Sequence, residues 1–373
     1  MPARLSDVTA ALDLLYPPRL AADWDAVGLV CGDPEAPVSK VLFAVDPVQA
    51  VVDEALALRA DLLVTHHPLY LRGTTSVAAD HPKGKVVHHL VQGGSALFVA
   101  HTNADRATDG VNDALAALFD LQGTASLEPA VEELDKLVVF VPVADADRVR
   151  LAVTAAGAGR LGRYDSCTWS TIGTGTFRPL EGSTPAIGRV GTFEEIEEVR
   201  LETVLPRRLR AAVVAALGQA HPYETPAYDV IPVASAAAVE GLGRVGDLPA
   251  PLTLAELVSR AAAVLPATAW GVRGSGDPST VIKRLAVCGG SGDSALRSAA
   301  ASGAQAYLTS DLRHHPVSEA PEGLALIDAA HWATEWPWLP TAAAALTRVV
   351  GVEAVVSTLC TDPWTTATRS SSA

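Results

Sequence analysis

Two adjacent histidines, His66 and His67, follow the short apolar run Leu62-Leu63-Val64 and precede Pro68. The run is too short for a helix and predicts a buried strand, and the proline favours an extended conformation at His67. Both imidazoles are therefore expected at the carboxyl end of a strand, where ligands bind in open α/β sheets. Because neighbouring residues of an extended chain point to opposite sides, we expect each ring to hold one of two nearby metal ions.

Other candidate ligands stand at further predicted strand ends, namely Asp105 just beyond His101, Asp311, and His331 with Glu335. On a helix, the four-residue spacing of His331 and Glu335 places both side chains on one face. Imidazole and carboxylate ligands without a thiolate suit zinc, manganese or iron, and a bridging carboxylate is common in hydrolytic centres with two metals. The alternative is that each histidine is a hydrogen-bonded polar residue at a strand end, but the joint pattern favours a metal site.

Three further histidine motifs are expected outside this site or at its edge. His88-His89 fits the surface or the packed face of an amphipathic helix. His314-His315-Pro316 repeats the first motif in a predicted polar turn, where we expect at most a supporting role beside Asp311. His221-Pro222-Tyr223-Glu224 is interpreted as a turn that its proline fixes.

The segment Gly289-Gly290-Ser291-Gly292-Asp293 follows a predicted strand and opens a predicted helix. Backbone N–H groups at such a place can hold a phosphate. No Gly-Lys-Ser/Thr follows, however, and a tight turn is at least as good an interpretation. Trp332, Trp336 and Trp338 are expected to pack in the core rather than to wall a pocket. No cysteine has an evident base beside it, so a thiol nucleophile is not expected.

The composition excludes several classes of protein. A chain of 373 residues that is 49% apolar can bury a core and form two domains or more. With a net charge of −14, a pI near 5.1 and no basic patch, it shows no clear nucleic-acid surface. Its four cysteines lie far apart without a CxxC pair, which favours a cytoplasmic protein over a disulfide framework or a zinc ribbon. We find no apolar leader and no apolar stretch of about 20 residues, so neither a signal peptide nor a membrane span is expected.

The elements that must position these residues alternate between strands and helices, as in βαβ units with a largely parallel sheet. The pattern changes near residue 135, where the order βα, loop-rich hairpin, βαβ predicts a small α+β module with a ferredoxin-like fold. The α/β pattern then returns. The predicted strands of the two α/β parts cover 41–45, 62–64, 95–100, 284–288, 306–309 and 324–328, and a further short strand is expected between the glycines of 24–32.

These motifs together resemble the GTP cyclohydrolase I type 2 homologues, also called NIF-three-like dinuclear metal proteins. The resemblance extends over nearly the whole chain. It rests on the segments Trp24–Leu29, Thr65–Leu69, His101–Asp105, Gly110–Asn112, Tyr307–Asp311 and Asp328–Glu335. In the insert it rests on Gly173–Phe177 and His221–Glu224. Two positions depart from the family pattern: Ala26 stands where asparagine is usual, and Ala330 where glycine is usual.

The resemblance implies the fold class and the domain boundaries. We expect a three-layer α/β metal-binding domain, formed by residues 1–134 and 236–373, that is split by an inserted ferredoxin-like α+β domain over 135–235. This insert would be similar to CutA and P-II-like trimeric proteins. The resemblance also implies a homohexamer of two stacked trimers.

The resemblance further implies two divalent metal ions per subunit, which are zinc, iron or manganese. His66 and Asp105 would hold one ion, His67 and His331 the other, and Glu335 would bridge them. The implied activity is a metal-dependent hydrolysis in which metal-bound hydroxide attacks a purine nucleotide such as GTP, or a phosphoester. The alternative is a non-enzymatic metal-binding or regulatory hexamer. The sequence assigns no catalytic residue beyond the ligands.

Overall fold

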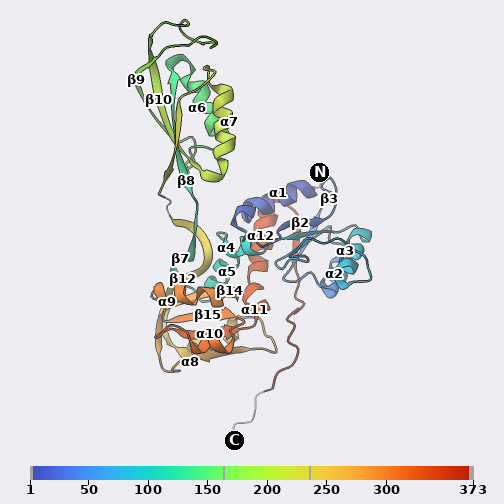
Figure 1. Ribbon diagram of the computed structural model, residues 1–373. Coiled ribbons are helices and arrows are strands. Elements are labelled where there is room, and N and C mark those ends of the chain that lie inside the picture. The colour runs from blue at the N-terminus through green and yellow to red at the C-terminus, as the bar shows by residue number, and fades with distance from the viewer. Residues whose placement is uncertain (1–2, 163, 235–236, 369–373) are drawn as a thin grey trace. The chain divides into compact units, whose positions relative to one another are not determined.

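Two units make up the chain in the computed structural model, which describes residues 3–162, 164–234 and 237–368. One unit combines Met1–Ala130 with Val239–Ala373, and the other comprises Val131–Ala238. Figure 1 shows the elements of both. The boundary expected between residues 235 and 236 falls outside the described residues.

The first sheet of the larger unit has five strands in the order β17-β4-β5-β6-β2. Four of them run parallel, and only β2 pairs antiparallel, with β6. The strands are β2 (Gly28–Cys31), β4 (Lys40–Ala44), β5 (Leu62–Thr65), β6 (Ala96–Val99) and β17 (Glu353–Val356). The expected largely parallel sheet is therefore present here, and β17 joins it from the far end of the chain.

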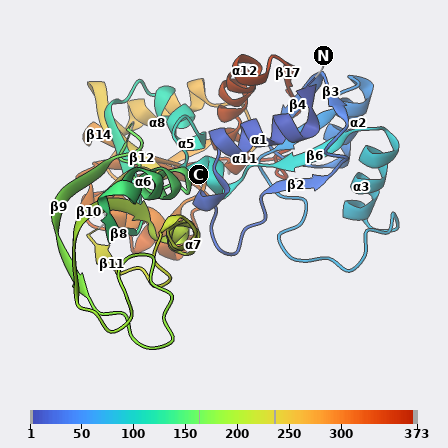
Figure 2. The same cartoon turned by 90° about the horizontal axis from the view of Figure 1, so that it is seen from above.

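Successive residues of each strand point to opposite sides of this sheet, and both faces are covered by other elements. In β4, Leu42 and Ala44 pack against α2 (Gln49–Ala57) and α3 (Pro82–Gln92), which lie on the outer side (Figure 2). Val41 and Phe43 face the inner core instead. The longer helices that contribute to that core are α1 (Leu5–Leu15), α5 (Val111–Ala117), α8 (Leu254–Val264) and α12 (Trp338–Val350).

The second sheet has six strands in the order β13-β16-β15-β14-β12-β7. Its central strands β14, β15 and β16 are parallel, whereas β12 and β13 pair antiparallel with them, so this sheet is mixed rather than largely parallel. The helix α9 (Leu296–Ala301) packs on its outer face. The strands are β7 (Gln122–Val131), β12 (Ala237–Thr253), β13 (Val272–Ser275), β14 (Val281–Ser291), β15 (Ala306–Ser310) and β16 (Ala325–Ala329).

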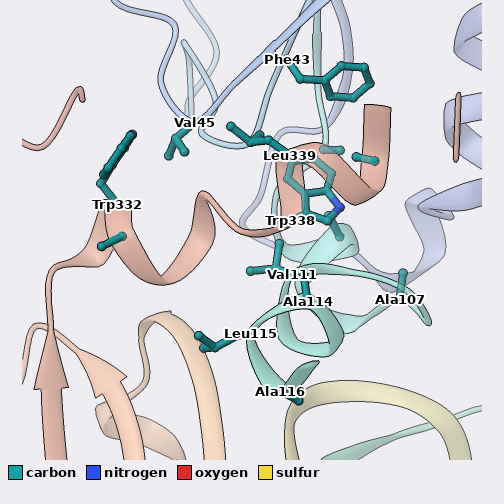
Figure 3. Close-up of a cluster of buried hydrophobic side chains, with 14 of the residues drawn as sticks. Phe43, Val45, Ala107, Val111, Ala114, Leu115, Ala116, Trp332, Trp338 and Leu339 are labelled. Atoms are coloured by element: carbon teal, nitrogen blue, oxygen red, sulfur yellow. The ribbon is translucent and has the colours of Figure 1, made fainter. Parts of the chain in front are cut away.

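One hydrophobic core joins the two sheets into a mixed α/β fold. Phe43 and Val64 of the first sheet and Val287 and Leu308 of the second belong to the same cluster of buried side chains. Figure 3 shows a part of it, in which Trp338 and Leu339 of α12 lie near Val111 of α5. Trp338 is fully buried and Trp332 is 5% exposed, so these two pack in the core as expected. Trp336 is only half-buried, and with Trp332 it lines a pocket, so the expectation was wrong in that part.

The smaller unit is built from six elements in the order β-α-β-β-α-β. They form a four-stranded antiparallel sheet in the order β11-β8-β10-β9. The helices α6 and α7 lie side by side on one face and enclose a core with Val139, Val149 and Leu201 (Figure 1). The elements are β8 (Leu134–Pro142), α6 (Ala146–Ala155), β9 (Thr168–Phe177), β10 (Glu194–Pro206), α7 (Arg210–Ala220) and β11 (Tyr228–Val233). Within the described ranges, every helix is too short or too polar to traverse a lipid bilayer.

The shared core predicts a large loss of stability on truncation of Phe43, which is fully buried. We expect Phe43→Ala to lower the free energy of unfolding by about 3–5 kcal/mol, because it removes buried ring contacts and leaves a cavity. The measurement is urea unfolding followed by tryptophan fluorescence. Val349→Ala, at a position that is 55% exposed, is the matched control and should change the free energy by less than about 0.5 kcal/mol. Equal effects of the two substitutions would contradict the shared core.

Candidate metal centre

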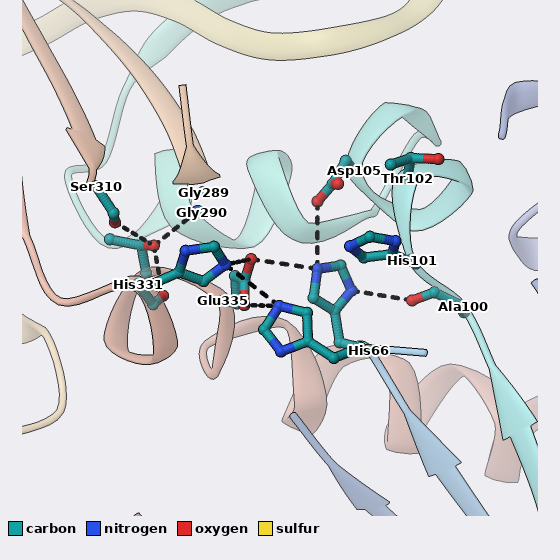
Figure 4. A network of polar contacts seen from close by, with 12 residues as sticks. His66, Ala100, His101, Thr102, Asp105, Gly289, Gly290, Ser310, His331 and Glu335 are labelled. Atoms are coloured by element: carbon teal, nitrogen blue, oxygen red, sulfur yellow. Dashed lines mark hydrogen bonds and ion pairs between the residues drawn. The ribbon is translucent and has the colours of Figure 1, made fainter. Parts of the chain in front are cut away.

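Strand ends from both sheets meet at one place in the larger unit (Figure 4). His66 and His67 follow β5, His101 follows β6, and Asp105 lies in the short helix α4 (Thr102–Arg106). The second sheet contributes α11 (His331–Glu335), which begins just after β16. The parallel strands of each sheet end at one edge, and these two edges supply the side chains of the site.

The carboxylate of Glu335 lies at the centre of this group. Its Oε1 is 2.9 Å from His331 Nε2 and 3.4 Å from His66 Nε2, and its Oε2 is 3.1 Å from His67 Nε2. The helical spacing predicted for His331 and Glu335 is therefore confirmed, because α11 places both on one face. Asp105 Oδ1 lies 3.6 Å from His66 Nε2.

Among the residues that the structure describes, two sets of three side chains have ligand atoms within 4.8 Å of one another. One set is His66, His67 and His101, and the other is His67, His331 and Glu335. His101 was not among the predicted ligands. Its signal in the sequence is its place directly after a strand, which is the same signal that identified His66 and His67.

Three buried atoms of the centre fit a bound cation. His66 Nε2, Asp105 Oδ1 and Glu335 Oε2 have no hydrogen-bond partner among the described residues. Buried polar atoms are nearly always hydrogen-bonded, because leaving them unpaired costs free energy. Imidazole nitrogens and carboxylate oxygens without a thiolate are the donors that zinc, manganese and iron accept. A divalent ion therefore fits the residues present.

The other ring nitrogen of each histidine is held by a partner outside the centre. The Nδ1 atoms of His67, His101 and His331 lie 2.7, 2.8 and 2.7 Å from the carboxylates of Asp46, Asp25 and Asp311. His66 Nδ1 donates to the carbonyl oxygen of Ala100 at 2.9 Å. Such contacts fix the orientation of an imidazole and leave its Nε2 for a metal. Sequence reasoning missed the roles of Asp25 and Asp46, although Asp46 follows the end of β4 closely.

The adjacent histidines do not point to opposite sides, so that expectation was wrong. Their ring centroids are 5.2 Å apart, and both Nε2 atoms approach Glu335. The chain bends at His66 and His67 instead of remaining extended, and Thr65 Oγ1 donates to the carbonyl oxygen of His67 across the bend. The bend turns both imidazoles toward the same centre.

The glycine-rich segment after residue 288 lies against this centre. Gly289 and Gly290 belong to the end of β14 rather than to a turn that opens a helix. A Cβ on Gly290, which has φ of +66°, would lie 2.5 Å from Glu335 Oε1 and 3.1 Å from His331 Nε2. Glycine is therefore required for the close approach of β14 to the site. Neither the phosphate loop nor the tight turn named this close packing, whereas the expected helix does follow, as a 3-10 turn at Asp293–Ala295 that leads into α9.

The remaining histidine motifs lie elsewhere. His314 and His315 begin the short helix α10 (His314–Ser318) rather than a polar turn. Both are exposed, and His315 pairs with Glu319, so the supporting role expected for this motif beside Asp311 was wrong. His89 contacts Gln49 on α2, as the interpretation of surface or packing predicted. Asp311 itself contacts His331 and has φ of +58°, a conformation that non-glycine residues rarely adopt.

The charges of the centre hold protons on the imidazoles. Burial disfavours a charged His67 or His331, but the carboxylate of Glu335 outweighs it and raises the pKa of His67 to about 10 and that of His331 to about 11. Burial alone would raise the pKa of Glu335, yet the surrounding imidazolium charges lower it well below its usual range. Burial raises the pKa of Asp105.

The chain is similar to known proteins over most or nearly all of its length. A family model described as Duf34/NIF3 (NGG1p interacting factor 3) matches residues 3–363. The GTP cyclohydrolase 1 type 2 homolog of Mycobacterium tuberculosis is 51% identical over 370 residues, which are 98% of this chain and 97% of that protein. The Bacillus subtilis protein of the same name is 39% identical over 319 residues and 85% of each chain. The crystal structure of a Bacillus cereus protein related to NIF3 has a TM-score of 0.81 at 36% identity, and the match covers 98% of this chain and 99% of that one.

The contact of Asp311 with His331 predicts that Asp311→Asn weakens metal binding. Loss of the charge that orients and polarises His331 should reduce zinc affinity by about ten- to a hundredfold, as for other outer partners of ligating histidines. The measurement is a competition titration with a zinc chelator. Asp277→Asn, an exposed carboxylate that hydrogen-bonds within its own turn, is the control and should leave the affinity unchanged. Equal affinities of the two variants would exclude this role of Asp311.

The raised pKa values predict that metal binding releases protons. In the absence of a metal, the pKa values of His67 and His331 lie near 10 and 11. At pH 7.5 both rings would therefore be positively charged, with a proton on each of their two nitrogens. A ligating imidazole must be neutral, so about two protons should leave on binding, and the apparent affinity should rise about a hundredfold per pH unit. Calorimetry in buffers of different ionisation enthalpy counts the protons. No release, with an affinity independent of pH between 6.5 and 8.5, would contradict this prediction.

Proposed function

The chain belongs to the DUF34/NIF3 family, and from this premise we propose that it is a metal-dependent hydrolase with a centre of two divalent ions. The observation that carries the proposal is the position of Glu335. Its carboxylate is 3% exposed and lies between the Nε2 atoms of three imidazoles, while buried atoms of the same group have no hydrogen-bond partner among the described residues.

We propose that His66 and Asp105 hold one ion, that His67 and His331 hold the other, and that Glu335 bridges them. His101 stands beside the first pair, where it offers a further nitrogen. Divalent ions in such centres lower the pKa of water and polarise phosphoryl or carbonyl oxygens. Asp46, Asp25 and Asp311 keep the imidazoles in place for this role, because each contacts the Nδ1 atom that faces away from the centre.

A cavity beside the centre supports an anionic substrate. It has a volume of about 640 Å³, and its lining residues include His67, Asp46, Lys83 and Lys85. The chain has only five lysines, and these two have no ion-pair partner among the described residues. In a protein with a net charge of −14, unpaired lysines at this cavity favour a phosphate-bearing molecule. A nucleotide such as GTP and a phosphoester both meet this requirement.

We propose that the smaller unit is a ferredoxin-like module of the CutA and P-II-like kind, because its elements follow the order β-α-β-β-α-β with a sheet order of β11-β8-β10-β9. We also propose a homohexamer of two stacked trimers, on the resemblance of the chain to its family.

The proposed function is tested by metal content and turnover together. We expect about two metal ions per chain in the purified protein by plasma mass spectrometry. Glu335→Gln should lose at least one ion, since it removes the bridging charge. The metal-loaded protein should hydrolyse GTP or a phosphoester such as p-nitrophenyl phosphate. The Glu335→Gln variant should lose at least about a hundredfold in kcat/KM, because a metal-dependent step cannot proceed without its ions.

Two comparisons separate the possible failures. Lys83→Gln with Lys85→Gln should raise KM and leave the metal content intact, and Lys283→Gln is the matched control on an exposed stretch of β14. Two ions per chain without turnover of any nucleotide or phosphoester would favour the non-enzymatic metal-binding assembly. One ion or none, unchanged by Glu335→Gln, would refute the centre of two ions.

A further inference from the structure

A second cavity lies within the smaller unit, and none of its lining residues belongs to the metal centre. Its volume is about 260 Å³, and its walls include Phe177, Pro185, Ile187, Glu198 and Tyr223. Two motifs of the insert meet here, because Phe177 ends the segment Gly173–Phe177 and Tyr223 belongs to His221–Glu224. The rings of Phe177 and Tyr223 are 5.7 Å apart at an angle of 58°.

Glu198 of β10 is the one carboxylate that is buried in this wall, with 8% of its surface exposed. Its Oε1 accepts a hydrogen bond from the hydroxyl group of Tyr223 at 3.0 Å. A Cβ on Gly175 would lie 2.0 Å from its Oε2, so the neighbouring strand leaves room for the carboxylate only because residue 175 is glycine. The side chain is therefore held in a defined place over β9.

No cation of the chain neutralises this carboxylate, as far as the described residues go. Arg178, which follows Phe177, lies over the ring of Phe193 instead. Arg200 pairs with Glu202 and Arg148 with Asp145. His221 donates from Nε2 to the carbonyl oxygen of Phe140 and accepts at Nδ1 from the N–H of Tyr223. Both of its nitrogens are thus used by a neutral ring, and burial lowers its pKa.

A buried carboxylate without a cationic partner costs free energy, which a bound cation would recover. The surroundings indicate which kind of cation. The faces of aromatic rings attract organic cations, and Pro185 and Ile187 offer apolar contacts beside them. A bare divalent ion would require several oxygen ligands. The second carboxylate of this wall, Glu224, is exposed and already accepts a hydrogen bond from the N–H of Thr184.

We propose that this cavity binds a small organic ammonium ion, whose charged group pairs with Glu198 between Phe177 and Tyr223 and whose apolar part lies against Pro185 and Ile187. All residues that line this cavity belong to the smaller unit. The cavity gives the motifs Gly173–Phe177 and His221–Glu224 a role in ligand binding, in addition to the bend that the second of them forms between α7 and β11.

The test compares 3-methylbutylamine with 3-methylbutan-1-ol, which has the same apolar part without the charge. Binding to the full-length protein is measured by calorimetry at pH 7. The amine should bind at least about tenfold more tightly than the alcohol, and Glu198→Gln should remove at least about tenfold of the amine affinity, as expected for one charge-assisted contact. Glu197→Gln is the matched control, because Glu197 is the exposed neighbour on the opposite face of β10. It should leave the affinity unchanged.

Two further measurements distinguish a ligand site from a structural role. Without amine, Glu198→Gln should melt at the same temperature or higher, because it removes an unpaired buried charge; a clearly lower Tm would overturn the proposal. Phe177→Leu, which keeps an apolar side chain but removes the ring face, should also weaken amine binding. Equal affinities for amine and alcohol, or no binding of either, would overturn the proposal. A changed assembly mass of Glu198→Gln without amine binding would assign the cavity to a side chain from a second copy of the chain.

Discussion

The buried charge of Glu335 is the constraint on which the larger unit depends. A carboxylate that is 3% exposed is stable only if positive charge or hydrogen-bond donors surround it. The chain supplies His66, His67 and His331 at distances of 2.9 to 3.4 Å. Each of these rings in turn has its Nδ1 held by a carbonyl oxygen or a carboxylate. The imidazoles thus stabilise the glutamate, and the outer carboxylates and the carbonyl group in turn orient the imidazoles.

This arrangement requires both sheets at once. His66 and His67 belong to the first sheet, whereas Glu335 follows the last parallel strand of the second, and neither sheet alone can surround the carboxylate. The shared core explains how the strand ends of the two sheets are held close together. Trp338 is fully buried beside His66, with ring centroids 5.6 Å apart, so the helix that packs the core also supports a histidine of the centre. The same residue therefore stabilises the core of this unit and positions a side chain of the metal centre.

The sequence predicted the strand ends and the helical spacing well, because both depend on local pattern. The run Leu62-Leu63-Val64 lies within β5, and His331 and Glu335 lie on one turn of α11. The bend at His66 and His67 could not be predicted, since it depends on a local hydrogen bond and on contacts with a distant glutamate. The contacts of Asp46 and Asp25 join positions 21 and 76 residues away, and no periodicity reports such pairs. The mixed second sheet depends on long-range pairing in the same way.

Two glutamates, Glu198 and Glu335, are buried in the described part of the chain, and neither is fully paired by other side chains there. Glu335 has histidines around it, and still its Oε2, with two atoms of its neighbours, has no hydrogen-bond partner in the described part of the chain. Glu198 has a single phenol and no cation of the chain among the described residues. In both places the protein keeps a charge that its own side chains do not fully satisfy, although a neutral residue would cost less. The economical explanation is that the missing partner comes from solution. The donors around Glu335 fit a metal ion, and the rings beside Glu198 fit an organic cation.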